Sequence, residues 1–384
     1  MAGLTINDPA VFSSVIQSAN ILPGDIIQLA DGIYRGDFTL QRQVAGLPGN
    51  PIKIMPRHPG KVVIDGSLVV NGNYVEIYDI DFIDSRTDRH LITNAIQLNT
   101  PGSALYGCSI CDIHGYGGVR WSLGGPSEIS ENIIYNNGYR AADGIGHGHA
   151  IYGLNDPGGL KTIARNLFFK QFGKYSIHLY SDTNSGIALK DFHCIDNIIC
   201  GHPVQAGGGD GLSNFRYDGN WQYQAWCQLG RYSLAGTNQD ATILNNTAIQ
   251  LDFFRLYDFQ TVVAANNSMY ECAEWPIMDG FANLPLPAAL TRVIPFSKSK
   301  RWLGAIAIFN RDAAETVAVD LSSLLQPGSY RLRNGQNVHE TWSFDYAGGS
   351  VDVPTGWTSA PRIGDDATEP TWPLFGGLVI EVVD

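Results

Sequence analysis

The chain has 384 residues, enough for one large domain or two of ordinary size, and 44% of them are hydrophobic. Its formal net charge of -12 argues against nucleic-acid binding, which requires clustered Lys and Arg, and no apolar run is long enough to cross a bilayer. With 43 glycines and only 16% charged residues, the composition favours tight turns over solvated helices, which is typical of an all-β protein.

The first predicted element is a short helix near the N-terminus. Asp8 is placed to cap this helix, and Pro9 to occupy its first turn. An apolar face begins at Phe12, includes Ile16 and ends at Ala19. The preceding stretch "MAGLTINDPA" lacks a basic start and an apolar run, so no signal peptide is visible.

A short motif then recurs: a polar residue followed by alternating apolar residues. Clear copies begin at Asn132, Asn166, Asn197, Asn246 and Asn267, with weaker ones at Asp81 and Ser109. Most intervals are 21 to 34 residues, which indicates a solenoid of strand-like coils. Stacked Asn side chains can bond one another and the turn backbone at a corner. We therefore predict a right-handed parallel β-helix over residues 1–284, with the N-terminal helix capping its open end.

The repeat is broken by "FANLPLPAALTRVIP", which contains three prolines. Beyond it, short alternating stretches such as "GAIAIFNRD" and "GGLVIEVVD" are separated by turns, so a small antiparallel, sandwich-like β domain is predicted over residues 285–384. The six cysteines show no zinc-ribbon spacing and are expected to be small buried thiols.

The stretches "LPGDIIQLADGIYRGDFTL", "GNPIKIMPRHPGKVVIDG" and "YVEIYDIDF" resemble the opening coils of pectate-lyase-like β-helix proteins, nearest to the alginate lyase and chondroitinase B type of polysaccharide lyase. The resemblance covers about residues 4 to 275 and implies action on an acidic polysaccharide outside the cytoplasm, in the extracellular space or periplasm. Those lyases use a Lys and Arg pair beside calcium-binding acidic residues. That set cannot be assigned here, so calcium stays open as a cofactor. "GHG" at 146–148 resembles a polygalacturonase motif, but the paired aspartates expected upstream are absent.

Aligning the coils against one another predicts which side chains face solvent. If Ile96, Val119, Ile151, Ile177, Cys227 and Phe254 point inward, their successors point outward. That outward row consists of Gln97, Arg120, Tyr152, His178, Gln228 and Arg255, and Tyr180 and Tyr257 share its face. Arg binds carboxylates bidentately, and aromatic rings and Gln suit sugars, so this row is a candidate substrate-binding face. An ordinary solvated face is the alternative.

Two long insertions are expected beside the same face, at about 138–148 and 201–223. The first contributes Asp143 and His147, and the second Asp210, Arg216 and Trp221, as candidate catalytic or binding residues. The alternative is that such a stretch only covers the core.

The resulting hypothesis is a lyase that degrades a uronate-containing polysaccharide by β-elimination. His178 or His149 would be the base, Tyr152 the acid, and Arg120 or Arg255 the carboxylate clamp. Each histidine could instead only bond backbone carbonyls, and a zinc site from His147, His149 and His178 is a further alternative.

Two other function classes remain open. A β-helix hydrolase would need paired carboxylates, for which Asp143, Asp182 and Asp210 are candidates. A glycan-binding adhesin or a viral tail protein would bind the polymer without cleaving it. The protein could act as a monomer or a trimer.

Overall fold

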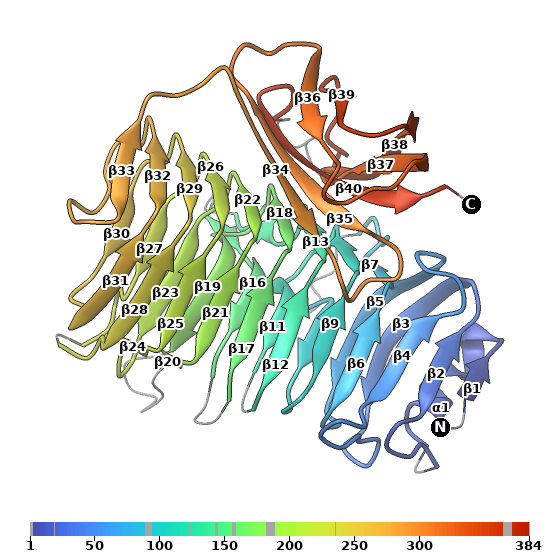
Figure 1. Cartoon of the computed structure of the whole chain (residues 1–384). Helices are drawn as coiled ribbons and strands as arrows, with labels where there is room; N and C mark the ends of the chain where they lie inside the picture. The colour runs from blue at the N-terminus through green and yellow to red at the C-terminus, as the bar shows by residue number, and fades with distance from the viewer. Residues whose placement is uncertain are drawn as a thin grey trace.

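The computed structural model describes residues 3–18, 20–88, 94–122, 125–142, 145–155, 159–181, 189–234, 236–363 and 371–383. In this part of the chain, parallel strands stack coil upon coil into a β-helix with three faces (Figure 1). The first face is a single ladder. Its strands are β1 (Gly3–Ile6), β2 (Ile26–Leu29), β4 (Ile52–Pro56), β6 (Val75–Tyr78), β9 (Ala104–Tyr106), β12 (Ser127–Ser130), β17 (Lys161–Ala164), β21 (Phe192–Ile195), β25 (Phe215–Asp218), β28 (Asp240–Leu244) and β31 (Thr261–Ala265).

The second and third faces diverge from two long strands, β3 (Gly32–Leu40) and β5 (Val62–Val70). The N-terminal half of β5 pairs with β7 of the second face, and its C-terminal half pairs with β8 of the third face. The second face contains β7 (Asp81–Ile83), β10 (Ser109–Cys111), β13 (Ile133–Tyr135), β18 (Leu167–Phe169), β22 (Ile198–Cys200), β26 (Trp221–Tyr223), β29 (Thr247–Ile249), β32 (Asn267–Tyr270) and β33 (Phe281–Leu284). The third face contains β8 (Ile96–Leu98), β11 (Gly117–Trp121), β16 (His149–Gly153), β19 (Tyr175–Ser181), β23 (Val204–Gly208), β27 (Cys227–Leu229) and β30 (Phe254–Leu256).

The predicted asparagine ladder is present at the corner between the first and second faces. The backbone N–H of each member except the last donates to the side-chain oxygen of the member one coil further on, at 2.9–3.1 Å. Its members are Asn132, Asn166, Asn197, Asn220, Asn246 and Asn267. Because these buried amides pair with one another, the corner leaves few polar groups unsatisfied.

Asn220 corrects the interpretation of the repeat. The 49-residue interval between Asn197 and Asn246 contains two coils, whose corners are 23 and 26 residues apart. The stretch 201–223 is therefore not an insertion beside the third face but a regular coil that supplies β23, β25 and β26. The weaker copies are also displaced by one residue, since Cys108, and not Ser109, donates its backbone N–H to Asn132.

The N-terminal cap confirms the first prediction. Asp8 accepts a hydrogen bond from the backbone N–H of Ala10 at the start of a 3-10 turn (Pro9–Val11), which leads into α1 (Phe12–Val15). The buried ring of Phe12 lies 4.8 Å from that of Phe38, so the helix closes the end of the core. Ala19 lies outside the described residues.

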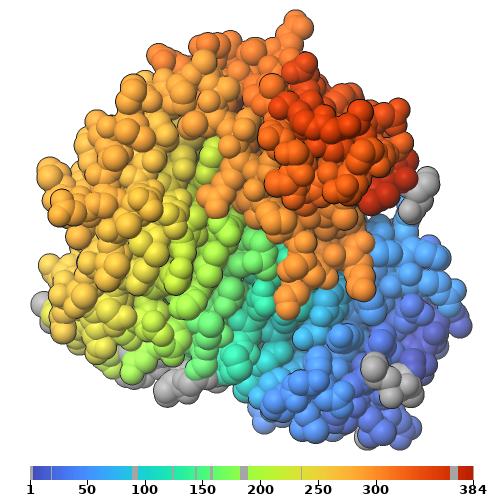
Figure 2. All heavy atoms as spheres, in the orientation of Figure 1, coloured from blue at the N-terminus to red at the C-terminus, as the bar shows by residue number. Residues whose placement is uncertain are grey.

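The C-terminal strands form an antiparallel sheet, as predicted. The sheet consists of β34 (Ala289–Pro295), β35 (Gly304–Asn310), β40 (Phe375–Val382), β37 (Gly328–Asn334) and β38 (Asn337–Tyr346), beside a ribbon of β36 (Thr316–Asp320) and β39 (Ser350–Pro354). Figure 2 shows this orange and red part lying against the coils.

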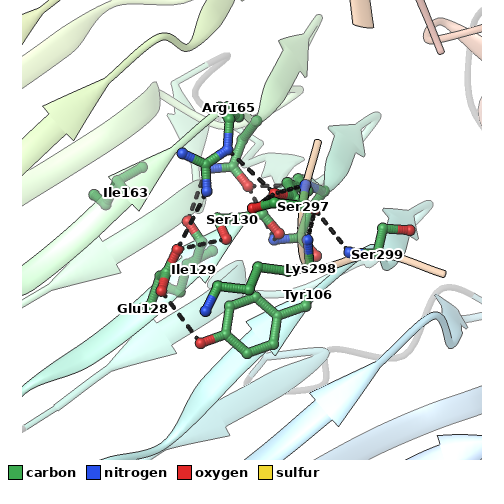
Figure 3. Close-up of polar contacts among 12 residues, drawn as sticks. Tyr106, Glu128, Ile129, Ser130, Ile163, Arg165, Ser297, Lys298 and Ser299 are labelled. Atoms are coloured by element: carbon green, nitrogen blue, oxygen red, sulfur yellow. Dashed lines mark hydrogen bonds and ion pairs between the residues drawn. The ribbon is translucent and has the colours of Figure 1, made fainter. Parts of the chain in front are cut away.

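The sheet packs on outward side chains of the second face, where the rings of Tyr223 and Phe375 stack at 4.7 Å. A second contact is electrostatic, because the buried carboxylate of Glu131 accepts hydrogen bonds from backbone N–H groups of Ser297–Ser299, the segment that Figure 3 labels. All six cysteines are buried free thiols, and no helix in the described ranges is long and apolar enough to span a membrane.

Candidate active site

The strands of the third face bring the predicted outward row into register. Gln97, Arg120, Tyr152 and His178 are direct neighbours on successive strands, and Gln228 and Arg255 follow further along. The residues predicted to point inward are all buried: Ile96, Val119, Ile151, Ile177, Cys227 and Phe254. The sequence prediction missed one member, Gln205, which lies between His178 and Gln228 in the overlooked coil.

A cleft of about 590 Å³ opens over the middle of this row. Its lining includes six predicted site residues: Arg120, His147, His149, Tyr152, His178 and Tyr180. These side chains come from β11, the hairpin before β16, β16 itself and β19, so three neighbouring coils build the cleft.

Two histidines face each other in the floor of the cleft. Nδ1 of His178 lies 3.2 Å from Nε2 of His149, and burial lowers the pKa of His178 to about 3. Burial, followed by the charges of neighbouring basic groups, also holds the pKa of His149 well below its usual value. Both imidazoles are therefore neutral at pH 7, and one donates its N–H to the other. Nδ1 of His149 is buried and has no hydrogen-bond partner among the described residues.

Three phenol rings surround His178. Its ring stacks on Tyr175 with centroids 4.4 Å apart and lies 5.3 Å from both Tyr152 and Tyr180. Burial raises the pKa of Tyr175 to about 12, so this hydroxyl stays protonated at neutral pH. A neutral imidazole flanked by phenols provides a proton acceptor and proton donors in one place.

The charged groups at the cleft are cations. Arg120 and Lys174 are exposed and line it, and none of its described lining residues is Asp or Glu. This local excess of positive charge contrasts with the net charge of -12 for the whole chain. Such an arrangement attracts an anionic ligand to this face in particular.

The hairpin before β16 confirms the predicted insertion at 138–148. Its arms, β14 (Tyr139–Arg140) and β15 (Gly146–His147), pair antiparallel, and the His147 ring stacks on Tyr139 at 5.2 Å. This hairpin forms one wall of the cleft.

Glycines allow the base of the hairpin to pack tightly. Gly148 has φ +90°, and a Cβ there would lie 2.6 Å from the carbonyl oxygen of Gly115. A Cβ on Gly173 would lie 2.0 Å from the carbonyl oxygen of Gly148. The glycines around His147 are thus required by close backbone approach.

Several predicted site residues lie outside the cleft although they belong to the row. Gln97 donates to Asn99 at 2.8 Å, and the buried Gln228 donates to the Tyr257 hydroxyl at 3.1 Å. Arg255 is held by Glu274 through two hydrogen bonds of 2.6 and 2.7 Å. Because Glu274 already neutralises Arg255, that arginine is poorly suited to clamp a substrate carboxylate.

Three further predicted residues lie elsewhere, because the sequence prediction treated the coil around Asn220 as an insertion beside the third face. Arg216 is on the first face and bonds Asp218, while Trp221 is on the second face, 6% exposed beneath the C-terminal sheet. Asp210 is exposed in the turn after β23 and does not line the cleft. Asp143 and Asp182 lie outside the described residues.

Several cleft residues were not predicted, among them Lys174, Tyr175, Gln205 and Tyr232. Lys174 and Tyr175 immediately precede the aligned segment of β19, so extending that segment by two residues would have included them. Gln205 is 1% exposed, yet it lines the cleft and its Oε1 accepts no hydrogen bond from the described residues. An unpaired amide oxygen of this kind can accept a hydrogen bond from a sugar hydroxyl.

The described residues of the cleft do not fit a metal ion. The described residues contain no group of three or more His, Cys, Asp or Glu side chains able to hold one, so His147, His149 and His178 do not form the zinc site considered above. Calcium prefers carboxylate and carbonyl oxygens, and the described lining provides no carboxylate.

Comparison with known proteins gives distant similarities. The chondroitinase B family model matches residues 10–111, which precede most of the cleft residues. The structure is similar to a PL6 family polysaccharide lyase from Pseudopedobacter saltans, with 14% identity, 71% of this chain and 76% of that chain covered, and a TM-score of 0.46. It is also similar to the A-module of the mannuronan C-5 epimerase AlgE6 from Azotobacter vinelandii, with 14% identity, 70% and 74% coverage, and a TM-score of 0.46. Pectate lyase Pel9A gives 15% identity, 71% and 73% coverage, and a TM-score of 0.40. No curated protein sequence matches the chain.

Proposed function

We propose that this protein cleaves a uronate-containing polysaccharide by β-elimination. One observation carries the proposal: a cleft whose charged described residues are the cations Arg120 and Lys174 surrounds a neutral histidine pair and several phenols. Cations select an anionic sugar, and neutral imidazole and phenol groups can move protons at pH 7.

In the proposed reaction, Arg120 binds the uronate carboxylate and offsets its negative charge. This makes the C5 proton of the same sugar more acidic, because the carbanion that develops at C5 is delocalised into a carboxylate that the guanidinium stabilises. Lys174 adds a second positive charge at the cleft.

His178 then accepts the C5 proton. The electron pair of the C5–H bond forms a C4–C5 double bond, the bond from C4 to the bridging oxygen breaks, and Tyr152 donates a proton to that oxygen. For Nε2 of His178 to be the acceptor, its Nδ1 must carry the hydrogen and donate it to Nε2 of His149, 3.2 Å away. His149 is then the residue that fixes the tautomer of the base.

Hydrolysis has less support because no pair of carboxylates lines the described part of the cleft. An epimerase would begin with the same proton removal and return a proton to C5 without breaking the chain, and a binding protein would release no product. These are alternative outcomes of the same experiment. Since polymers of this kind occur outside the cytoplasm, we propose that the protein acts in the extracellular space or periplasm.

The test is a panel of acidic polysaccharides (alginate, pectate and chondroitin) incubated with the protein, with a neutral glucan as the matched control. An unsaturated uronate at the new chain end, seen as ultraviolet absorbance and as a product mass 18 Da below the hydrolysis product, is the expected result. New reducing ends without that absorbance would identify a hydrolase. Altered uronate stereochemistry without cleavage would identify an epimerase, and binding without any product would identify a binding protein.

A further inference from the structure

Arg362 belongs to the C-terminal part of the chain but is buried against the β-helix beside the cleft. It is 3% exposed, and its Nη2 donates to the carbonyl oxygen of Gly138 and to Nδ1 of His114, the latter at 2.9 Å. Its guanidinium lies 4.2 Å from the ring centroid of Phe172. The side chain thus contacts three separate segments of the β-helix.

Two of these segments continue directly into the cleft. Gly138 begins the β14–β15 hairpin, whose second arm contains His147. Phe172 lies two residues before Lys174, and its backbone N–H donates to Asn137 at 2.8 Å. The N–H of Lys174 in turn donates to the carbonyl of Gly148 at 2.7 Å, so the two segments are hydrogen-bonded to each other at both of these positions.

The chain around Arg362 is fixed to the same corner. The carbonyl of Ala360 accepts a hydrogen bond from the Asn136 side chain at 3.1 Å, and the N–H of Ile363 donates to Asp112 at 3.2 Å. Taking a guanidinium out of water is costly, and the carbonyl, imidazole and aromatic contacts help to offset that cost. Truncating Arg362 would leave the carbonyl of Gly138 and Nδ1 of His114 without this donor.

We propose that Arg362 is a positioning residue through which the C-terminal domain holds the cleft in shape. It does not touch the cleft itself. It fixes the hairpin that carries His147 and the segment that carries Lys174, so the substrate-binding wall depends on a domain outside the β-helix. The kinetic part of this inference rests on the proposed function, whereas the structural part does not.

The test compares Arg362→Met and Arg362→Lys with a matched control, Arg292→Met, in the full-length protein. Arg292 also joins the C-terminal sheet to the β-helix, by donating to the carbonyl of Gly219 and to Asp196, but at the corner between the first and second faces. We expect all three variants to weaken domain docking and only the first two to act on the hairpin.

Hydrogen–deuterium exchange is the first readout. In Arg362→Met we expect amides of residues 138–142, 145–148 and 172–175 to exchange at least tenfold faster than in the wild type, with little change there in Arg292→Met. Arg362→Lys should be intermediate, because an ammonium can reach one acceptor but cannot span both. Equal protection of these segments in all variants, or equal loss in Arg292→Met, would overturn the inference.

Steady-state kinetics on the polymer found in the panel is the second readout. We expect KM to rise at least fivefold in Arg362→Met while kcat stays within about twofold, with partial rescue in Arg362→Lys. A uniform fall in active protein without a change in KM would indicate lost stability only and would contradict the positioning role. If no polymer is cleaved, the proposed function fails while the exchange experiment still decides whether Arg362 positions the hairpin. If Arg362→Met does not fold, the comparison of Arg362→Lys with the wild type carries the same two readouts.

Discussion

Replacing His178 by Gln tests the proposed base and its burial together. Gln keeps a polar side chain of similar length, but its amide is not basic enough to accept the C5 proton. General base catalysis contributes roughly 10²- to 10⁴-fold, so we expect kcat to fall by about that factor, which corresponds to roughly 3–5 kcal/mol of activation free energy. KM should change little, because Arg120 and Lys174 provide the charge that binds the substrate.

The same substitution should change how stability depends on pH. The pKa of a histidine is about 6.5 in the unfolded chain, and burial lowers that of His178 to about 3 in the folded protein. As the pH falls below about 6.5, the unfolded chain binds a proton that the folded protein does not, so stability is full above this pH and declines towards pH 3. At pH 4 this one group lowers the free energy of unfolding by about 3 kcal/mol relative to pH 7. His178→Gln should lose about that much less stability over the same interval.

Both effects can be measured on one preparation. Initial rates follow product absorbance, and the free energy of unfolding comes from urea denaturation at pH 7 and pH 4. His58→Gln is the matched control, because His58 is an exposed histidine beside Asp31 and remote from the cleft. A His178→Gln variant that retains a third or more of wild-type kcat would refute the assignment of the base. An unchanged stability difference between the two pH values would refute the burial on which its low pKa depends.

Three further predictions address other parts of the argument. Arg120→Leu should raise KM on the anionic polymer at least tenfold, Arg120→Lys should raise it less, and added salt should weaken polymer binding by the wild type in an affinity titration. Asn197→Ala should lower the free energy of unfolding by about 3 kcal/mol in urea titrations, because it removes the partner of the buried backbone N–H of Asn166 and of the carbonyl of Ile163 on the preceding coil, whereas the exposed Asn283→Ala should stay within about 0.5 kcal/mol. Gly148→Ala should displace the hairpin and reduce kcat/KM at least tenfold while circular dichroism still reports an intact β-helix; full activity would show that the close approach at Gly148 is not needed.

The sequence predicted the direction of the side chains better than the number of coils. Alternation with period two placed Arg120, Tyr152 and His178 outward, and a slip by one residue would have buried all three. The coil around Asn220 was missed because its apolar row contains Gly, Gln and aromatic residues in place of the aliphatic residues that mark the other coils. Trp221 was assigned to the substrate face because this coil was missed. It lies on the second face, where its outward apolar side chain is explained by the C-terminal sheet that covers it.

Contacts between distant segments could not be predicted from a single sequence. Nothing in the local pattern around Arg362 indicates that it is buried against Gly138. The two residues are 224 positions apart in the sequence, and only the folding of the coils and turns brings them together. The pairing of His149 with His178 was within reach, since Tyr152 and His178 are in register and His149 begins the same strand. The lowered pKa values of these two histidines could not be predicted from the sequence, because they depend on the burial of both rings.

The low pKa of His178 bears on how the proposed reaction would start. A base with a pKa of about 3 is present in the right form at pH 7 but is too weak to remove a carbon-bound proton efficiently. Burial is the largest cause of that low value, and the positive charge of Lys174 adds to it. A uronate carboxylate in the cleft would compensate the charge of Lys174 and favour a positive charge on the imidazole, which raises the pKa of His178. In the proposed mechanism the anionic substrate therefore strengthens the base that acts on it, and a neutral sugar of the same shape would leave that base inactive.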